Sequence, residues 1–137
     1  MDIDYELKKT TYKTETNESL CFYVKNNNKI IYKLELPVDY MFEEDDYLTI
    51  DIIDNFSNTV KNTGKGNMFF TNSGNIGMCM FSVDKNILEI NIGCGVGFAD
   101  SYLYIELDSV KEKKILEFLE TLKSCLEQYI TTKMYWK

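Results

Sequence analysis

The sequence predicts an α+β fold, in which a twisted antiparallel sheet is closed by one C-terminal amphipathic helix. Two observations predict it: segments of alternating polar and apolar residues run through residues 2–107, and apolar residues with helical spacing follow over residues 109–130. A chain of 137 residues has the length of a single domain. We therefore expect one domain over residues 1–137 with six to eight strands, and we leave open whether the sheet curls into a barrel-like form.

The strands are predicted from alternation and from the turn residues between them. Ile3, Tyr5 and Leu7 alternate with charged residues, which is the pattern of a half-buried strand. Residues 10–19 are polar and fit either an edge strand or a loop. Pro37 ends a strand because it cannot donate a hydrogen bond to a neighbouring strand. The predicted strands cover residues 2–8, 20–25, 29–36, 47–54, 68–71, 76–83, 87–92 and 101–107.

Two hairpins have a predictable register. A run of asparagines forms the first turn, and pairing about Asn27 places Phe22 opposite Tyr32. A second turn further along the chain places Ser82 opposite Leu88. Each register is a specific prediction, because a shift by one residue moves every side chain of a strand to the opposite face.

The middle of the chain is predicted to contain a strand followed by a long loop. Leu48, Ile50 and Ile52 lie on one side of the strand predicted over residues 47–54. The following residues, 55–66, are polar and rich in asparagine and glycine, a composition typical of a loop.

The C-terminal helix is predicted by its periodicity and by a capping box. Ser109 is expected to accept a hydrogen bond from the Glu112 amide, and the Glu112 side chain to accept one from the Ser109 amide. The apolar positions, which recur with i, i+3, i+4 and i+7 spacing, are Val110, Ile115, Phe118, Leu119, Leu122, Leu126, Tyr129 and Ile130.

Strands followed by one helix give a layout that is similar to that of pleckstrin-homology-like domains.

The composition excludes several kinds of chemistry. The chain carries 22 acidic and 15 basic residues, for a formal charge of −7, and contains no histidine. All the basic residues are lysines, so histidine bases, histidine metal ligands and bidentate arginine clamps are excluded. No nucleophile and base form a recognisable pair, so we do not expect an enzyme, and we expect no metal and no cofactor. The negative charge disfavours direct nucleic-acid binding, whose affinity comes largely from neutralised phosphates.

The cysteines and the hydropathy pattern predict a cytoplasmic protein without a membrane partner. No two of the four cysteines have the C-x-x-C spacing of a zinc site. The first residues do not resemble a secretory leader, and no apolar run is long enough to span a membrane. We therefore expect buried, reduced thiols, with one disulfide or a reactive Cys94 as alternatives. The cysteines are Cys21, Cys79, Cys94 and Cys125.

A glycine-rich segment follows one of the predicted strands. Residues 87–97 read ILEINIGCGVG, which resembles the first motif of Rossmann-fold methyltransferases. The resemblance implies binding of S-adenosylmethionine, with residues 105–108 in the place of the next strand and its ribose-binding acid. Only residues 98–100 separate the glycines from the next predicted strand, which is too short for the helix that a Rossmann fold places there. We therefore interpret the segment as a flexible connector between antiparallel strands and keep an S-adenosylmethionine-dependent enzyme as a remote alternative.

An acidic segment that contains aromatic residues is the candidate partner-binding site. No basic residue occurs between Lys33 and Lys61, whereas acids are frequent there. Four consecutive carboxylates repel one another and favour exposure, and the neighbouring aromatic side chains can supply anchoring contacts. The simpler interpretation is a solvated loop whose charge protects a sheet edge from aggregation. The candidate site comprises Asp39, Tyr40, Phe42, Glu43, Glu44, Asp45, Asp46 and Tyr47.

The function that we expect is binding to a basic surface on another protein. Its most concrete form is an inhibitor or immunity-type protein that covers the basic site of a nucleic-acid-processing enzyme, with carboxylates in the place of phosphates. The alternatives are a single-stranded nucleic-acid-binding domain and an adaptor that holds a peptide at a sheet edge or in a helix groove. The sequence does not determine the oligomeric state.

Overall fold

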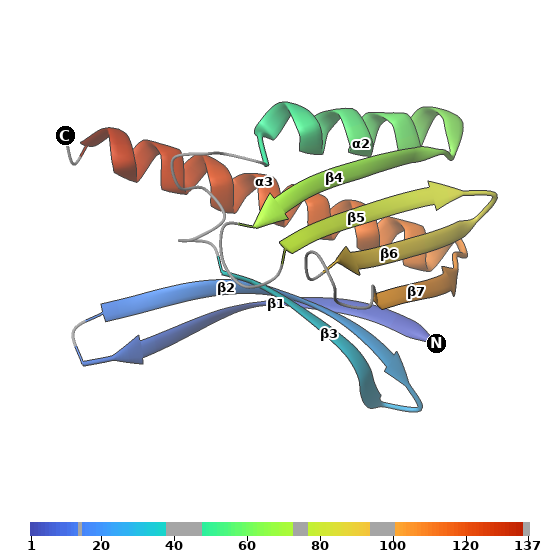
Figure 1. Ribbon diagram of the computed structural model, residues 1–137, viewed down its shortest axis with the longest axis horizontal. Coiled ribbons are helices and arrows are strands. Elements are labelled where there is room, and N and C mark those ends of the chain that lie inside the picture. The colour runs from blue at the N-terminus through green and yellow to red at the C-terminus, as the bar shows by residue number, and fades with distance from the viewer. Residues whose placement is uncertain (14, 38–47, 73–76, 94–100, 136–137) are drawn as a thin grey trace.

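The protein folds into two antiparallel sheets and two helices, as the computed structural model shows (Figure 1). The structure describes residues 1–13, 15–37, 48–72, 77–93 and 101–135. Sheet A has the strand order β1-β2-β3, and sheet B has the order β4-β5-β6-β7. The elements are β1 (Asp2–Tyr12), β2 (Glu15–Asn26), β3 (Lys29–Pro37), α2 (Ile50–Thr63), β4 (Gly66–Asn72), β5 (Gly77–Asp84), β6 (Ile87–Gly93), β7 (Ser101–Glu106) and α3 (Ser109–Tyr135).

The α+β class and the C-terminal helix are confirmed, but the single sheet closed by one helix is wrong. The strands form two sheets, and α2 separates β3 from β4 along the chain. The described strands form no closed barrel. The extra helix also departs from the pleckstrin-homology-like order, in which strands precede one helix. The polar residues 10–19, for which a strand and a loop were both open, lie largely within the long hairpin of β1 and β2.

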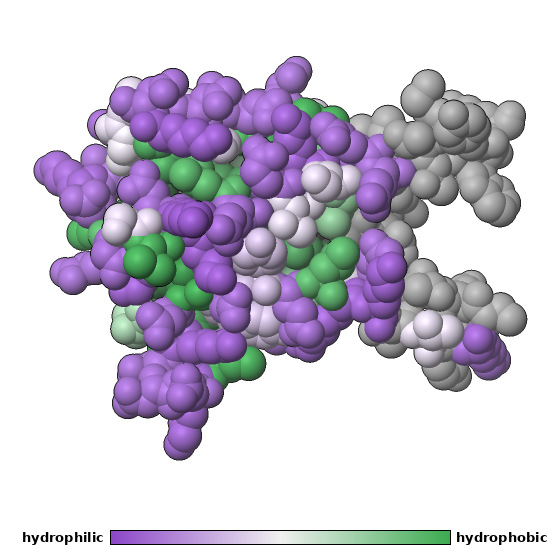
Figure 2. Space-filling model, turned by 180° about the vertical axis from the view of Figure 1, so that it is seen from behind, coloured by the Kyte–Doolittle hydropathy of each residue, from purple (hydrophilic) through white to green (hydrophobic). Residues whose placement is uncertain are grey.

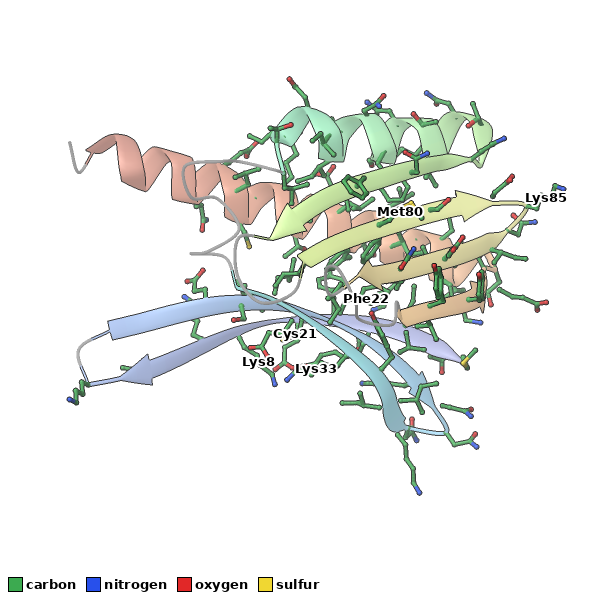
Figure 3. The ribbon with its side chains drawn as sticks, viewed as in Figure 1. Lys8, Cys21, Phe22, Lys33, Met80 and Lys85 are labelled. Carbon is green, nitrogen blue, oxygen red and sulfur yellow. The ribbon has the colours of Figure 1, made fainter. Side chains whose placement is uncertain are left out.

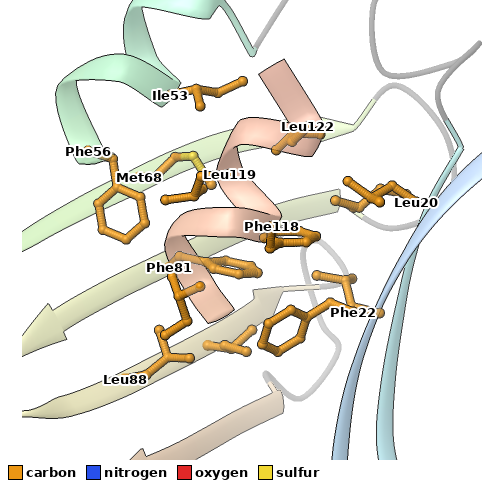
Figure 4. Close-up of a cluster of buried hydrophobic side chains, with 14 of the residues drawn as sticks. Leu20, Phe22, Ile53, Phe56, Met68, Phe81, Leu88, Phe118, Leu119 and Leu122 are labelled. Atoms are coloured by element: carbon orange, nitrogen blue, oxygen red, sulfur yellow. The ribbon is translucent and has the colours of Figure 1, made fainter. Parts of the chain in front are cut away.

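The hydrophobic core lies where α3 meets both sheets. In the view of Figure 1, α3 runs behind sheet B, and sheet A lies below both. The ring of Phe118 on α3 lies 5.1 Å from the ring of Phe22 in sheet A and 6.0 Å from the ring of Phe81 in sheet B, measured between centroids (Figure 4). All three rings are fully buried, so one aromatic cluster joins the two sheets and the helix.

The first hairpin has a different register from the predicted one. Asn27 and Asn28 have φ values of 52° and 65°, so the turn contains two left-handed residues. A bulge near the turn then shifts the register, and Phe22 lies opposite Leu34 instead of Tyr32. The bulge restores the shared buried face of Phe22 and Leu34, which a two-residue turn alone would have disrupted.

The second hairpin is shifted by one residue from its predicted register. Lys85 and Asn86 have φ values of 52° and 61° and form another two-residue turn. Leu88 therefore lies opposite Val83, and the predicted pairing of Leu88 with Ser82 is wrong. Both Val83 and Leu88 are buried, so the observed register places apolar side chains together where the predicted one did not.

Helix α2 replaces the strand and the loop that the sequence predicted over residues 47–66. The Oγ1 of Thr49 accepts a hydrogen bond from the Ile52 amide at 3.2 Å and caps the first turn. Gly64 ends the helix with φ 67°, and its amide donates to the Val60 carbonyl at 2.9 Å. The buried side of α2, at helical spacing, consists of Ile53, Phe56, Ser57 and Val60.

Helix α3 begins where predicted, but its cap is different. The Oδ1 of Asp108 accepts a hydrogen bond from the Lys111 amide at 2.8 Å, and the Asp108 carbonyl accepts one from the Glu112 amide at 2.9 Å. Asp108 is therefore the N-cap, and the predicted capping by Ser109 is wrong. The hydrogen bond from the Lys111 amide is the main cause that lowers the pKa of Asp108.

Candidate functional site

The predicted acidic site lies outside the described residues. Nothing in the structure brings its members together or separates them, so a site has to be sought among the described side chains. The residues concerned are Asp39, Tyr40, Phe42, Glu43, Glu44, Asp45, Asp46 and Tyr47.

The outer face of sheet B is the candidate site, because no described helix covers it. Residues on this face alternate with the buried ones that contact the helices. Figure 1 looks onto this face, and Figure 3 shows Met80 near its centre. By strand register, its described members are Asn67 and Phe69 on β4, Met80, Ser82 and Asp84 on β5, Ile87, Glu89 and Asn91 on β6, and Tyr102, Tyr104 and Glu106 on β7.

Four large apolar or aromatic side chains on this face are exposed to solvent. The exposed fractions are 49% for Phe69, 41% for Ile87, 53% for Tyr102 and 58% for Tyr104. Single exposed apolar residues are ordinary on a protein surface, whereas several on one sheet face indicate a contact surface. Tyrosine and phenylalanine are also the side chains that most often anchor protein interfaces.

The same face carries carboxylates that form no salt bridge with the described lysines. Asp84, Glu89 and Glu106 form no salt bridge with any described lysine, and the described side chains of the face include no lysine. Lys85 lies in the turn at the far end of β5 and β6 (Figure 3). The charge of the face is therefore negative, and its natural complement is a cationic group.

The outer face of sheet A has the opposite character, because its charges largely neutralise one another. Lys25 lies 3.5 Å from the Asp4 carboxylate, and Lys114 on α3 lies 3.6 Å from the same group. Lys33 lies 3.5 Å from the Glu35 carboxylate. Such exposed pairs contribute little to stability, but they leave this face with little net field for a charged partner.

A buried tyrosine lies at the centre of the outer face of sheet A. The Tyr23 hydroxyl donates to the Glu6 carboxylate at 3.1 Å, and the Lys8 ammonium lies 5.9 Å from the centre of the Tyr23 ring. Figure 3 shows Lys8 and Cys21 below this sheet, on the side away from Phe22. Burial, with the Cys21 and Glu6 side chains as further causes, raises the pKa of Tyr23 to about 12. The tyrosine is thus held neutral, which suits a structural role.

Among the described side chains on the outer face of sheet B, a polar atom of Asn91 is buried and has no hydrogen-bond partner. The Oδ1 of Asn91 forms no hydrogen bond with any described group. An unsatisfied buried acceptor costs roughly 1–3 kcal/mol, and stable folds retain few of them. Asn91 lies between Met80 and Tyr102 in the register, at the centre of the candidate surface.

The glycine-rich segment does not belong to a Rossmann fold. Strands β6 and β7 on either side of it are antiparallel neighbours, whereas the methyltransferase motif needs a parallel strand reached through a crossover helix. Glu106 and Asp108 therefore do not occupy the place of a ribose-binding strand. The described residues also contain no cluster of three potential metal ligands.

Among the described residues, the side of the molecule behind sheet B presents a largely polar surface (Figure 2). Figure 2 shows that this side is mostly hydrophilic, with hydrophobic residues in separate patches. None of the helices in the described ranges combines the length and the apolar character needed to cross a membrane.

The cysteines that the structure describes are structural. Cys21 and Cys125 are free thiols and both are buried, as the sequence led us to expect of them. Burial is the main cause that raises the pKa of the Cys125 thiol, which lowers its reactivity. The side chains of Cys79 and Cys94 lie outside the described set.

No protein family, curated protein or solved structure matches this chain.

Proposed function

We propose that this protein is an acidic binding module that docks on a basic surface of another protein. The observation that supports the proposal is the outer face of sheet B, where exposed aromatic rings lie among carboxylates that form no salt bridge with a described lysine. In such an interface the rings provide the buried contact area, and the carboxylates provide orientation and a faster association. The formal charge of −7 adds a long-range attraction, which is screened over about 8 Å at physiological salt.

In its most specific form, the proposed module is an inhibitor or immunity-type protein that covers the basic site of a nucleic-acid-processing enzyme. Such a site recognises negative charge together with flat rings that stack. The outer face of sheet B offers both features, through its carboxylates and its exposed tyrosines. The acidic segment 39–47 belongs to the same proposal as a second source of charge and aromatic contacts.

A single-stranded nucleic-acid-binding domain is the second candidate. An open four-stranded face with exposed aromatic rings is typical of surfaces on which bases stack. The carboxylates on this face favour the first candidate, because they would repel phosphates.

Fluorescence anisotropy separates these candidates with three probes: labelled octalysine, labelled octaglutamate and a labelled oligothymidylate. The protein-binding proposal expects affinity for octalysine that falls steeply with added salt, and none for the other two probes. Replacing both Glu89 and Glu106 by glutamine should weaken octalysine binding by roughly three- to tenfold. The matched control replaces Glu117 and Glu120 on α3 by glutamine. This variant loses the same amount of negative charge, but from the helix behind sheet B.

The outcomes distinguish binding at the outer face of sheet B from attraction by the overall negative charge of the protein. Equal loss in the two double variants would contradict a role for the outer face of sheet B. Binding of oligothymidylate but not of octalysine would establish the nucleic-acid alternative instead. Neutralising Glu43, Glu44, Asp45 and Asp46 tests the acidic segment in the same assay. For the inhibitor form, excess oligonucleotide should release the protein from its native partner, because both would occupy one basic site.

A further inference from the structure

Tyr104 on β7 lies between two carboxylates on the outer face of sheet B. Glu89 on β6 lies directly opposite Tyr104 in the strand register. Glu106 is two residues further along β7 and therefore points to the same side of the sheet. The Tyr104 side chain is 58% exposed, so its ring is open to a partner.

The spacing in the sheet brings the three side chains within reach of one cation. Directly opposite residues in an antiparallel pair have Cβ atoms about 4.5–5.5 Å apart. Residues two apart on a strand are separated by roughly 6.5–7 Å. A cation placed on the face of the Tyr104 ring is therefore close to the carboxylates of Glu89 and Glu106. Neither carboxylate forms a salt bridge with a described lysine.

An arginine side chain fits this arrangement better than a lysine side chain. The planar guanidinium group stacks on an aromatic ring and at the same time donates two parallel hydrogen bonds to a carboxylate. An ammonium group is a compact, strongly hydrated charge that lacks the flat surface for stacking. The chain itself contains no arginine, so the group must come from a partner.

We propose that Tyr104, with Glu89 and Glu106, forms a recognition site for an arginine side chain presented by the protein partner. The proposal rests on the proposed function and makes it more specific, because it names the residue that the basic partner contributes. Tyr104 supplies the stacking surface, Glu89 accepts the guanidinium hydrogen bonds, and Glu106 adds charge along the strand.

The test compares octaarginine with octalysine, which have equal length and charge. The wild-type protein should bind octaarginine on the order of tenfold more tightly at moderate salt. Tyr104→Leu should remove most of this preference, whereas Tyr104→Phe retains a ring and should keep most of it. Glu89→Gln should reduce the preference, and the control Glu120→Gln on the exposed side of α3 should leave it unchanged.

Each outcome has a defined meaning. Tight binding of both peptides without a preference would overturn the arginine site and leave the proposed function intact. Absence of binding to either peptide would overturn both. Backbone amide shifts on adding octaarginine should concentrate in residues 87–91 and 102–106, and shifts confined to other elements would contradict the site. Thermal melts of each variant separate a loss of recognition from a loss of folding, and Tyr104→Phe and Glu89→Gln remain informative if Tyr104→Leu unfolds.

Discussion

At the scale of single residues, burial is the main cause that raises the pKa of Tyr23. Tyr23 is only 5% exposed although it lies on the outer face of a sheet, and the Lys8 and Lys25 side chains lie over its ring. Its hydroxyl is neutral and donates to Glu6. Deprotonation would place a phenolate beside a carboxylate with little access to water, which is why the pKa rises.

The elevated pKa of Tyr23 predicts a pH dependence of stability at the alkaline end. Its ordinary pKa is 10.0, and in the folded protein it is about 12. The neutral form is favoured by folding, so this contribution is fully present below pH 10 and is lost as the pH rises toward 12. Urea unfolding across this range should show a steeper loss of stability for the wild type than for Tyr23→Phe. Parallel curves for the two proteins would contradict the prediction.

Residue-scale patterns also contained part of the candidate surface. In the strand predicted over residues 101–107, Leu103 and Ile105 lie on the inner side of β7 and pack in the core. The same alternation places Tyr102, Tyr104 and Glu106 on the other side, so the sequence held the signal for this strand. The sequence did not reveal that Glu89 on β6 lies beside Tyr104. That placement depends on the register between β6 and β7, whereas the sequence analysis predicted a register only between β5 and β6.

At the scale of elements, the wrong prediction over residues 47–66 shows that one segment can fit both the period of a strand and the period of a helix. Ile50 and Ile52 suit a strand of period two, while Ile50 and Ile53 suit a helix. The decisive apolar positions, Phe56 and Val60, lie in a stretch whose polar composition suggested a loop. Tertiary burial of this sparse apolar side, together with the two caps, favours the helix.

The registers of the two hairpins could not be predicted from the sequence. Each register depends on the number of residues in the turn, and that number depends on backbone conformation. Lysine at φ 52° is an uncommon choice, since side chains other than glycine, asparagine and aspartate rarely adopt left-handed angles. The sequence therefore gave no strong reason to assign Lys85 to a two-residue turn. By contrast, α3 was predictable because its apolar residues recur with helical spacing over a long segment. Its start was also predictable, because adjacent residues can each serve as the N-cap.

The end of α2 provides a prediction about backbone conformation. Gly64 has φ 67°, and a Cβ added there would contact nothing within 4 Å. Gly64→Ala should therefore destabilise the protein by about 1 kcal/mol through backbone strain alone. At Gly66 an added Cβ would meet Phe56 and Thr59 at 3.4 Å without a positive φ. Urea unfolding should show a smaller effect for Gly66→Ala, and an unchanged stability of Gly64→Ala would contradict the prediction.

At the scale of the whole molecule, Phe118 connects parts of the chain that do not pair with one another. Phe118→Ala should destabilise the protein by about 3–5 kcal/mol, because it opens a cavity among rings from both sheets. Phe118→Leu should cost less because it fills more of the space. Chemical unfolding followed both by far-UV circular dichroism and by tyrosine fluorescence should give one shared transition. Separate transitions would show that the two sheets unfold independently.

Each of the two helices contacts a strand that does not immediately precede it in the chain. Helix α2 follows sheet A in the chain but packs along β4 of sheet B, whereas α3 follows sheet B and returns to contact β1. During synthesis on the ribosome, the apolar side of sheet A therefore lacks the part of its cover that α3 provides, although Phe81 of sheet B also contacts Phe22. Because sheet A precedes α3 in the chain, the contact between Phe22 and Phe118 forms only after α3 has been synthesised.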